Sequence, residues 1–268
     1  MSFEVNTLPE GYKFTKLYRK RVANNQDLTV IISDHQNRRG TGKTVLSLKL
    51  ARLMDRTDSG ITTENVAISP AELVDAYTDL PEGSALVLDE AEAGLSKYRA
   101  GSAVNMAMRE LVSMGRIEEK YLILNLPASS ELDRDLKALC NFWFMVQYKG
   151  RALGHHLNWN PYSEEPRTPK TDPWDWSDIP ENTDLRDVYD YLTKKKRQHL
   201  RGESEESSQR LTQTEVKERV EKIEKEVKNK TRNNVLISIY NNSNLTQQQL
   251  ADSIGLSRSR LADIVSDS

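Results

Sequence analysis

The chain lacks three features that would each indicate a class of protein: a second cysteine, a long apolar run and a strong net charge. Cys140 is the single cysteine, so no internal disulfide can form, and its place beside an apolar stretch favours the core. Because no apolar stretch reaches the roughly 20 residues that cross a bilayer, and no signal peptide heads the sequence, we expect a cytoplasmic protein without membrane contact. The net charge of −2 gives no general attraction to nucleic acid, so any such attraction must be local.

A glycine-containing loop lies between an apolar run and a helical pattern. The β-branched run Leu28–Ile32 predicts a strand, and Val45–Met54 has the spacing of an apolar helix. A phosphate-binding loop requires this context. In such a loop the glycines let the backbone wrap round an anion, the lysine reaches the β- and γ-phosphates, and the hydroxyl holds Mg²⁺. The sequence therefore predicts a site for ATP and Mg²⁺ formed by Gly40, Thr41, Gly42, Lys43 and Thr44.

The loop departs from the usual phosphate-loop pattern at one position. The first glycine, six residues before Lys43, is replaced by Asn37. Asparagine tolerates left-handed backbone better than other non-glycine residues, so the loop can keep its shape. A plain strand-to-helix turn with a solvated lysine is the alternative interpretation.

A second apolar run ends in two acidic residues. Ala85–Leu88 has the pattern of a buried parallel strand, and Asp89 and Glu90 follow it. We expect Asp89 to hold Mg²⁺ through water, and Glu90 to polarise the attacking water as a base. Two acids after a strand are common by chance, but their position downstream of a phosphate loop makes the pair informative.

The loop Gly40–Thr44, the acids Asp89-Glu90 and the pair Gly115-Arg116 before a later strand resemble the additional-strand, catalytic-glutamate class of P-loop ATPases. Within that class, residues 25–160 are most similar to the HerA/FtsK group of DNA-pumping motors and their Zot-like relatives. The resemblance implies an oligomeric ATPase that acts on DNA.

The resemblance also assigns roles to residues outside the two motifs. In the HerA/FtsK group a polar residue, usually Gln, ends the strand after the Gly-Arg pair and senses the γ-phosphate. Here the strand 121–124 ends in Asn125. Arg116 matches an arginine that can act on a neighbouring subunit's phosphate, with Arg134 as a weaker candidate. A helix C-terminal arginine that completes the dipole is the alternative for Arg116. The implied catalytic set is Glu90, Lys43, Asn125 and Arg116.

The order of expected elements predicts an α/β fold. Strands alternate with helices, which indicates a mainly parallel P-loop sheet with helices on both faces and ligand at the carboxyl ends of the strands. We expect a P-loop ATPase domain over 1–160, a proline-rich extension with a helix and a polar linker over 161–213, and a charged helix with a DNA-binding module over 214–268. Five of the nine prolines lie between Pro161 and Pro180, so little regular structure is expected there. Trp174 and Trp176 suggest that this segment is pinned to a surface.

Two basic segments have more than one interpretation. Residues 12–22 have the composition of an extra edge strand or a basic arm, whose charges meet DNA or are solvated. A helix expected over 183–199 ends in Lys194–Arg197. This basic end is either a phosphate contact or a solvated helix terminus, and the solvated terminus is the simpler interpretation.

The last 35 residues predict two crossing helices. Residues 244–255 have the pattern of a capped helix that ends at a glycine, and 256–265 begin a second helix at once. Their apolar positions suit packing at a tight corner, with 235–240 as a supporting helix. This pattern resembles the helix-turn-helix of small DNA-binding regulators. The residues expected to meet DNA are Ser257, Arg258, Ser259 and Arg260. Use of the motif for protein contact alone is the alternative.

Weak charge on this module favours several copies acting together. The arginines and aspartates of 231–268 balance, so one copy would bind DNA weakly. The charged helix that begins at Thr214 could assist self-association, so we expect a homo-oligomer. The members of its apolar seam are Val216, Val220, Ile223 and Val227.

Two functions are compatible with the whole pattern. The first is an ATP-hydrolysing motor or remodelling protein of a mobile element or virus that acts on DNA. The second is an ATP-switched DNA-binding regulator or partition-type factor with little hydrolysis. The acids Asp89-Glu90 and Arg116 favour the first function, whereas the DNA-binding module and the short chain favour the second.

Overall fold

The computed structural model contains two compact units, residues 1–220 and 221–268. The structure describes residues 7–36, 38, 40–89, 111, 119–126, 134–160, 162, 165–201, 225, 229, 232–233, 235–243 and 245–266. Within these residues, no helix is both long and apolar enough to cross a membrane.

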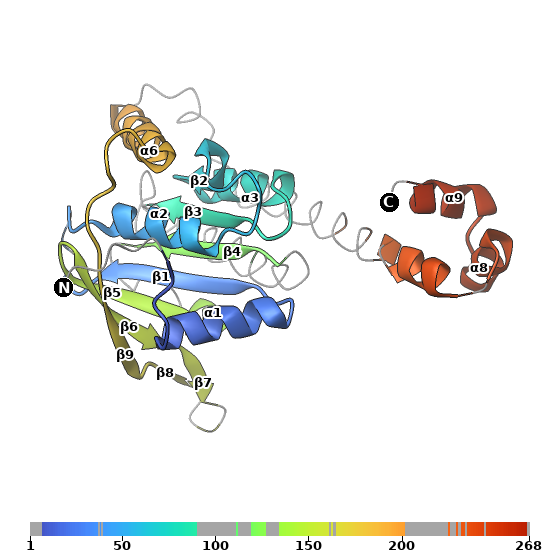
Figure 1. Cartoon of the computed structure of the whole chain (residues 1–268), viewed down its shortest axis with the longest axis horizontal. Coiled ribbons are helices and arrows are strands. Elements are labelled where there is room, and N and C mark those ends of the chain that lie inside the picture. The colour runs from blue at the N-terminus through green and yellow to red at the C-terminus, as the bar shows by residue number, and fades with distance from the viewer. Residues whose placement is uncertain are drawn as a thin grey trace. The chain divides into compact units, whose positions relative to one another are not determined.

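A seven-stranded sheet forms the centre of the first unit (Figure 1). In spatial order its strands are β2 Val66–Ala67, β3 Ala85–Asp89, β4 Tyr121–Asn125, β1 Leu28–Asp34, β5 Phe142–Tyr148, β6 Arg151–His156 and β9 Lys170–Asp175. The first five strands run parallel, and the last two pairs are antiparallel. The prediction of a mainly parallel α/β sheet is confirmed. Because β4 lies between β1 and β3, the glycine loop follows a strand that is two places from the strand that Asp89 ends.

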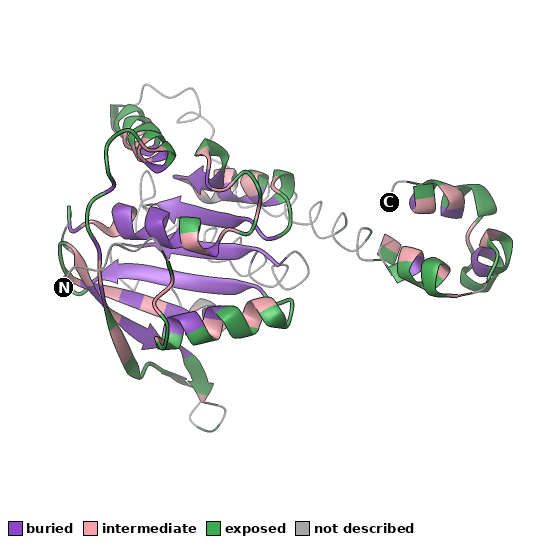
Figure 2. Cartoon of the chain, in the orientation of Figure 1, coloured by how far each residue is buried: buried purple, intermediate pink, exposed green. Residues whose placement is uncertain are grey.

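The central strands β1, β3 and β4 are buried along their whole length (Figure 2). Strands covered on both faces have nearly continuous apolar sequences, which explains the runs Leu28–Ile32 and Ala85–Leu88. The next strand, β5, alternates between buried and intermediate residues because it lies closer to the edge. Cys140, just before β5, is buried as expected.

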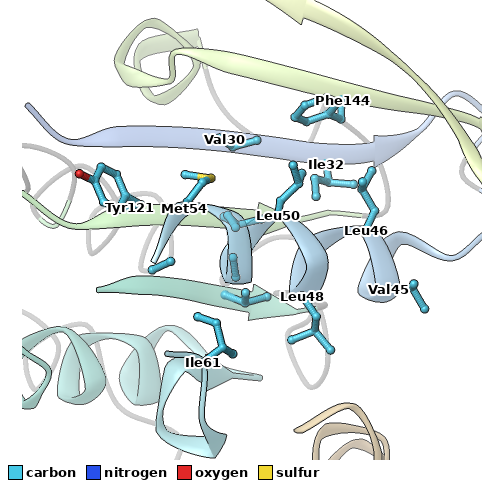
Figure 3. Close-up of a cluster of buried hydrophobic side chains, with 14 of the residues drawn as sticks. Val30, Ile32, Val45, Leu46, Leu48, Leu50, Met54, Ile61, Tyr121 and Phe144 are labelled. Atoms are coloured by element: carbon cyan, nitrogen blue, oxygen red, sulfur yellow. The ribbon is translucent and has the colours of Figure 1, made fainter. Parts of the chain in front are cut away.

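Two helices cover the same face of the sheet. The helices with described bounds in the first unit are α1 Lys13–Ala23, α2 Lys43–Met54, the short 3-10 helix η1 Thr63–Asn65, α3 Pro70–Asp79, α5 Arg134–Leu139 and α6 Asp184–Arg201. Figure 3 shows Leu46 of α2 pointing toward Ile32 of β1. Phe14 of α1 packs edge-on against Phe144 of β5, with ring centroids 5.1 Å apart. Ile32 and Phe144 are register partners, so α1 and α2 lie on one face.

Helix α1 begins at Lys13, within the segment that was expected to be an edge strand or a basic arm, so both expectations are wrong. Phe14, Leu17, Tyr18 and Val22 all pack on the core. Spacings of three and four residues place these side chains on one side of a helix, whereas a strand would divide them between two faces. Four basic residues of α1 are exposed, whereas Arg21 is partly buried and forms an ion pair with Asp27, 3.7 Å away. The exposed residues are Lys13, Lys16, Arg19 and Lys20.

The proline-rich segment also has regular structure, contrary to expectation. Strands β7 Asn158–Asn160 and β8 Glu165–Arg167 form a hairpin, and β9 pairs with β6 at the edge of the main sheet. Pro173 is tolerated in β9 because an edge strand has one side without ladder hydrogen bonds. Trp174 is 2% exposed and packs against Phe14 and Phe144. The expectation that the tryptophans pin this segment is confirmed.

The second unit is a small helical domain. Among its described residues, the helical segments are 235–242, α8 Gln247–Ile254 and α9 Arg258–Ser266, and residues 225, 229 and 232–233 are also helical. Thr246 and Gln249 form a reciprocal cap at the start of α8, and Gly255, with φ +69°, ends it. The buried core consists of Leu236, Leu250, Ala251, Leu261 and Ile264. The apolar residue Ile254 is 39% exposed, because Leu250 and Ala251 occupy the inward face of α8.

Candidate functional site

The glycine loop is shaped by the aspartate that ends β1. Asp34 Oδ1 accepts hydrogen bonds from the backbone N–H groups of Gln36, at 2.8 Å, and Arg38, at 3.1 Å. Burial alone would raise the pKa of Asp34, but these N–H groups and the Arg38 guanidinium hold its pKa below the ordinary value. The carboxylate therefore stays charged and ties the first half of the loop to the sheet.

The second half of the loop depends on two glycines in left-handed conformation. Gly40 has φ +71° and Gly42 has φ +83°, and α2 begins directly after Gly42. The Lys43 ammonium turns back to the Arg38 carbonyl, 3.4 Å away. The Thr41 hydroxyl is buried and has no hydrogen-bond partner among the described residues. The loop thus presents a helix N-terminus, a lysine and an unsatisfied hydroxyl together, as an anion site requires.

A side chain from the segment after β9 packs against this loop. A Cβ atom placed on Gly42 would lie 3.4 Å from Trp176 Nε1, and Trp176 is 7% exposed. Its backbone N–H donates to the carbonyl of Gly150, at 3.0 Å. The neighbouring Ser177 hydroxyl is 3.1 Å from the Lys49 ammonium on α2. The segment that follows the proline-rich strands therefore supports the loop from outside the sheet.

Three predicted site residues meet at the carboxyl ends of β3 and β4. Asp89 and Asn125 are register partners, and Asn125 Nδ2 donates a hydrogen bond to Asp89 Oδ1. The Thr44 hydroxyl donates to Asp89 Oδ2 at 2.9 Å. Asp89 is fully buried. Asn125 Oδ1 is also buried and has no partner among the described residues, so the amide keeps one acceptor for a further group.

The oxygen groups here suit a hard divalent cation. A hydroxyl and a carboxylate are the kinds of ligand that Mg²⁺ prefers, usually together with water and phosphate oxygens. Thr44 and Asp89 supply one of each within hydrogen-bond distance. The residues present therefore fit the Mg²⁺ ion that the sequence predicts at this site.

A lysine from α6 lies against the same two residues. Lys196 Nζ is 2.6 Å from Asp89 Oδ2 and 3.4 Å from the Thr44 hydroxyl. The neighbouring Lys195 forms an ion pair with Glu72 of α3, at 3.0 Å. The interpretation of this basic helix end as a solvated terminus is therefore wrong for these two lysines. One signal in the sequence pointed to this site: Leu185, Val188 and Leu192 are buried, and Lys196 continues their spacing of three and four.

Several predicted residues cannot be placed. Glu90, Arg116 and Asn37 lie outside the described residues. Arg134 begins α5, but its side chain also lies outside the description. The predicted residues that the structure brings together at one edge of the sheet are Gly40, Thr41, Gly42, Lys43, Thr44, Asp89 and Asn125.

The predicted DNA-binding residues form an exposed group in the second unit. Ser257, Arg258, Ser259 and Arg260 are all exposed at the start of α9. Ser257 Oγ accepts from the Arg260 backbone N–H at 3.3 Å and so caps the helix. Among the described residues, neither arginine forms an ion pair with a carboxylate. Two guanidinium groups at a helix N-terminus are thus available to phosphates or base edges.

Comparison with known proteins finds a family match within this second unit. Residues 228–267 match a family described as winged helix-turn-helix DNA-binding. The chain therefore carries a DNA-binding helix-turn-helix. The match covers the helices that hold Leu236, Leu250 and Leu261, which form the core of the unit. No curated protein and no solved structure matches the chain.

Proposed function

We propose that the first unit binds ATP with Mg²⁺ and hydrolyses it, and that this turnover drives work on DNA held by the helix-turn-helix. The observation that carries the proposal is the 2.9 Å hydrogen bond from Thr44 to Asp89. Thr44 follows the loop lysine, and Asp89 ends a strand two places from β1. A hydroxyl and a carboxylate that meet beside a helix N-terminus, at the carboxyl edge of a parallel sheet, are suited to Mg²⁺ and nucleotide.

The loop residues have separate tasks in this proposal. Gly40 and Gly42 let backbone N–H groups face the phosphates, and Thr41 can donate its unsatisfied hydroxyl hydrogen to a phosphate oxygen. Lys43 turns from the Arg38 carbonyl to the β- and γ-phosphates. Thr44 and Asp89 hold Mg²⁺, which when bound neutralises charge on the phosphates. The strand order β3-β4-β1 supports the additional-strand class because a strand separates the loop from the acid.

The catalytic step depends on residues near this cluster. Glu90 follows Asp89 directly in the sequence and takes the proton of the attacking water as a base. Asn125 Oδ1, which is buried without a partner among the described residues, accepts a hydrogen bond from the attacking water. Arg116 acts on the phosphate of a neighbouring copy in a homo-oligomer. The roles of Glu90 and Arg116 rest on the sequence resemblance.

A second candidate is a DNA-binding regulator or partition-type factor that uses ATP as a switch and hydrolyses little of it. The observation that favours this function is the match of residues 228–267 to a DNA-binding family. In that case ATP occupancy changes how many copies bind one DNA site. ATP hydrolysis would then stay slow, and DNA of any sequence would not stimulate it.

The test is steady-state ATP hydrolysis by the full chain, with and without duplex DNA, in wild type and in Glu90→Gln. We expect turnover that rises with DNA and falls by at least about 100-fold in the variant, which is typical for removal of a catalytic base. Glu64→Gln, on the exposed 3-10 helix η1, is the matched control and keeps wild-type turnover. Slow turnover that DNA does not stimulate, with tight binding to one DNA sequence, would favour the regulator. Absence of ATP binding by folded protein would refute both functions.

A further inference from the structure

We propose that Thr44 and Asp89 form a cation site with two alternative occupants, the Lys196 ammonium of α6 and a divalent metal ion that arrives with nucleotide. Loading of the metal and nucleotide then displaces Lys196 and frees the C-terminal turn of α6. This inference rests on the proposed function, because it concerns the same site.

The first argument is that the lysine occupies the position where the ion would bind. Lys196 Nζ lies within 2.6 Å of Asp89 Oδ2 and 3.4 Å of the Thr44 hydroxyl. The lysine side chain is 16% exposed, and the Asp89 side chain is fully buried. The ammonium therefore contacts the same two oxygen groups that suit a hard divalent cation.

The second argument concerns charge. A buried carboxylate is unstable without a positive partner or a full set of hydrogen bonds. Asn125 satisfies Asp89 Oδ1, and Lys196 supplies positive charge at Oδ2. A metal ion would meet the same need with twice the charge. Two cations that share one carboxylate oxygen in a place of low dielectric repel each other strongly, so the two occupants exclude one another.

The third argument is that Lys196 is held by the helix that carries it. Leu185, Val188 and Leu192 of α6 are buried in the core cluster that includes α2. Lys195, one residue before Lys196, pairs with Glu72. These contacts fix the last turns of α6 over the site, so the lysine is a tethered cation at high local concentration. Its release requires either a new side-chain conformation or movement of that turn.

Displacement of the lysine affects the part of the chain that leads onward. Helix α6 ends at Arg201, and the chain then continues through residues 202–220 to the DNA-binding unit. Without nucleotide, the last turn of α6 is docked on the site, and with nucleotide it is released. The point at which residues 202–220 are attached to the α/β unit would then change. Occupancy of the cation site is thereby coupled to the DNA-binding unit through the covalent chain.

The experiment measures binding of a non-hydrolysable ATP analogue by the full chain, with Mg²⁺ and with EDTA, using calorimetry. The variants are Lys196→Met, which keeps length without charge, and Lys196→Arg, which keeps charge. Lys194→Met is the matched control because Lys194 is exposed on the same helix. We expect Lys196→Met to bind the analogue roughly 5- to 150-fold more tightly with Mg²⁺, the usual range for coupled sites. We expect a much smaller change in EDTA, and values close to wild type for the other two variants.

A second readout follows α6 directly. Hydrogen exchange of residues 192–201 in the wild type should speed up when Mg²⁺ and the analogue are added together, and the exchange of Lys196→Met should be fast from the start. Circular dichroism confirms that each variant is folded.

The outcomes separate this inference from the proposed function. Weaker binding by Lys196→Met would mean that the lysine is a phosphate ligand. It would overturn the proposal that Lys196 and the metal ion compete for the same site. Equal binding by Lys196→Met and wild type, with unchanged exchange of α6, would also overturn it but leave the proposed function standing. If no folded variant binds the analogue, both the proposed function and the alternative occupants fail together.

Discussion

Asp89 contacts side chains from several elements of the candidate site. Its two oxygens accept from three side chains on three different elements: Thr44 on α2, Asn125 on β4 and Lys196 on α6. A buried carboxylate with these partners is well satisfied. A cation that binds the Asp89 carboxylate therefore competes with these partners, and the tethered lysine is the one that can leave without disturbing the sheet or the loop.

Gly42 is the loop residue with the least freedom to change. Its φ of +83° strains any residue with a Cβ, and that Cβ would lie 3.4 Å from Trp176 Nε1. We predict that Gly42→Ala lowers the free energy of unfolding by about 1 to 2 kcal/mol and also abolishes nucleotide binding, because the loop must shift to relieve the strain. Urea denaturation and calorimetry measure the two effects.

Gly60→Ala is the matched control for this prediction. Gly60 also has a left-handed φ, +61°, but a Cβ there would have no atom within 4 Å. We expect a similar loss of stability with unchanged nucleotide binding. If both variants bind nucleotide equally well, the shape of the loop at Gly42 is not important for the site.

Among the elements, the parallel strands and α2 could be predicted because local sequence and tertiary position agree. The runs Leu28–Ile32 and Ala85–Leu88 are buried on both faces, and such strands have no alternation to misread. The carboxyl ends of parallel strands meet at one edge, which is why Thr44, Asp89 and Asn125 were expected together. The structure places them in hydrogen-bond contact.

The elements that were missed are those whose partners lie far away in the sequence. Helix α1 has basic residues that suggested an arm, but Phe14 and Tyr18 are buried against aromatic residues of later strands. Strand β9 contains a proline, yet Trp174 holds it to the sheet. Lys196 has the spacing of a buried position, but the sequence alone does not say which carboxylate it meets. Tertiary packing outweighs local propensity in each case.

Trp174 is predicted to be the main anchor of β9. It is 2% exposed and packs against Tyr12, Phe14 and Phe144. Trp174→Ala should lower the free energy of unfolding by about 3 to 5 kcal/mol, as expected for removal of a large buried aromatic side chain. Trp159→Ala is the control, because Trp159 in β7 is 43% exposed, and it should cost much less. Similar urea midpoints for the two variants would contradict the role given to Trp174.

At the scale of the whole molecule, the chain joins an α/β unit to a helix-turn-helix and has a net charge of only −2. DNA affinity must therefore come from a few local contacts. We predict that Arg258→Ala and Arg260→Ala each weaken binding of duplex DNA by the full chain by about 1 to 3 kcal/mol if they touch bases. If they touch phosphates, each should lower the dependence of affinity on salt by about one unit of slope. Fluorescence anisotropy at several salt concentrations distinguishes the two cases.

Arg52→Ala is a control for the arginine variants, because Arg52 is exposed on α2 of the first unit. It should leave both the affinity and the salt dependence unchanged. Loss of DNA binding in Arg52→Ala, with none in Arg258→Ala, would assign the DNA contacts to the α/β unit instead.

The α/β unit extends well beyond its sequence motifs, because β9 and the residues after it complete its core. Every recognisable motif of the first unit is complete by Asn125, yet Trp174 fills part of its core, Trp176 packs on the glycine loop and α6 lies over α2. A gene fragment that stops after the motifs would encode a sheet with an exposed aromatic surface and an unsupported loop. Recombination that exchanges DNA-binding modules between genes would preserve the α/β unit only with a crossover beyond Arg201.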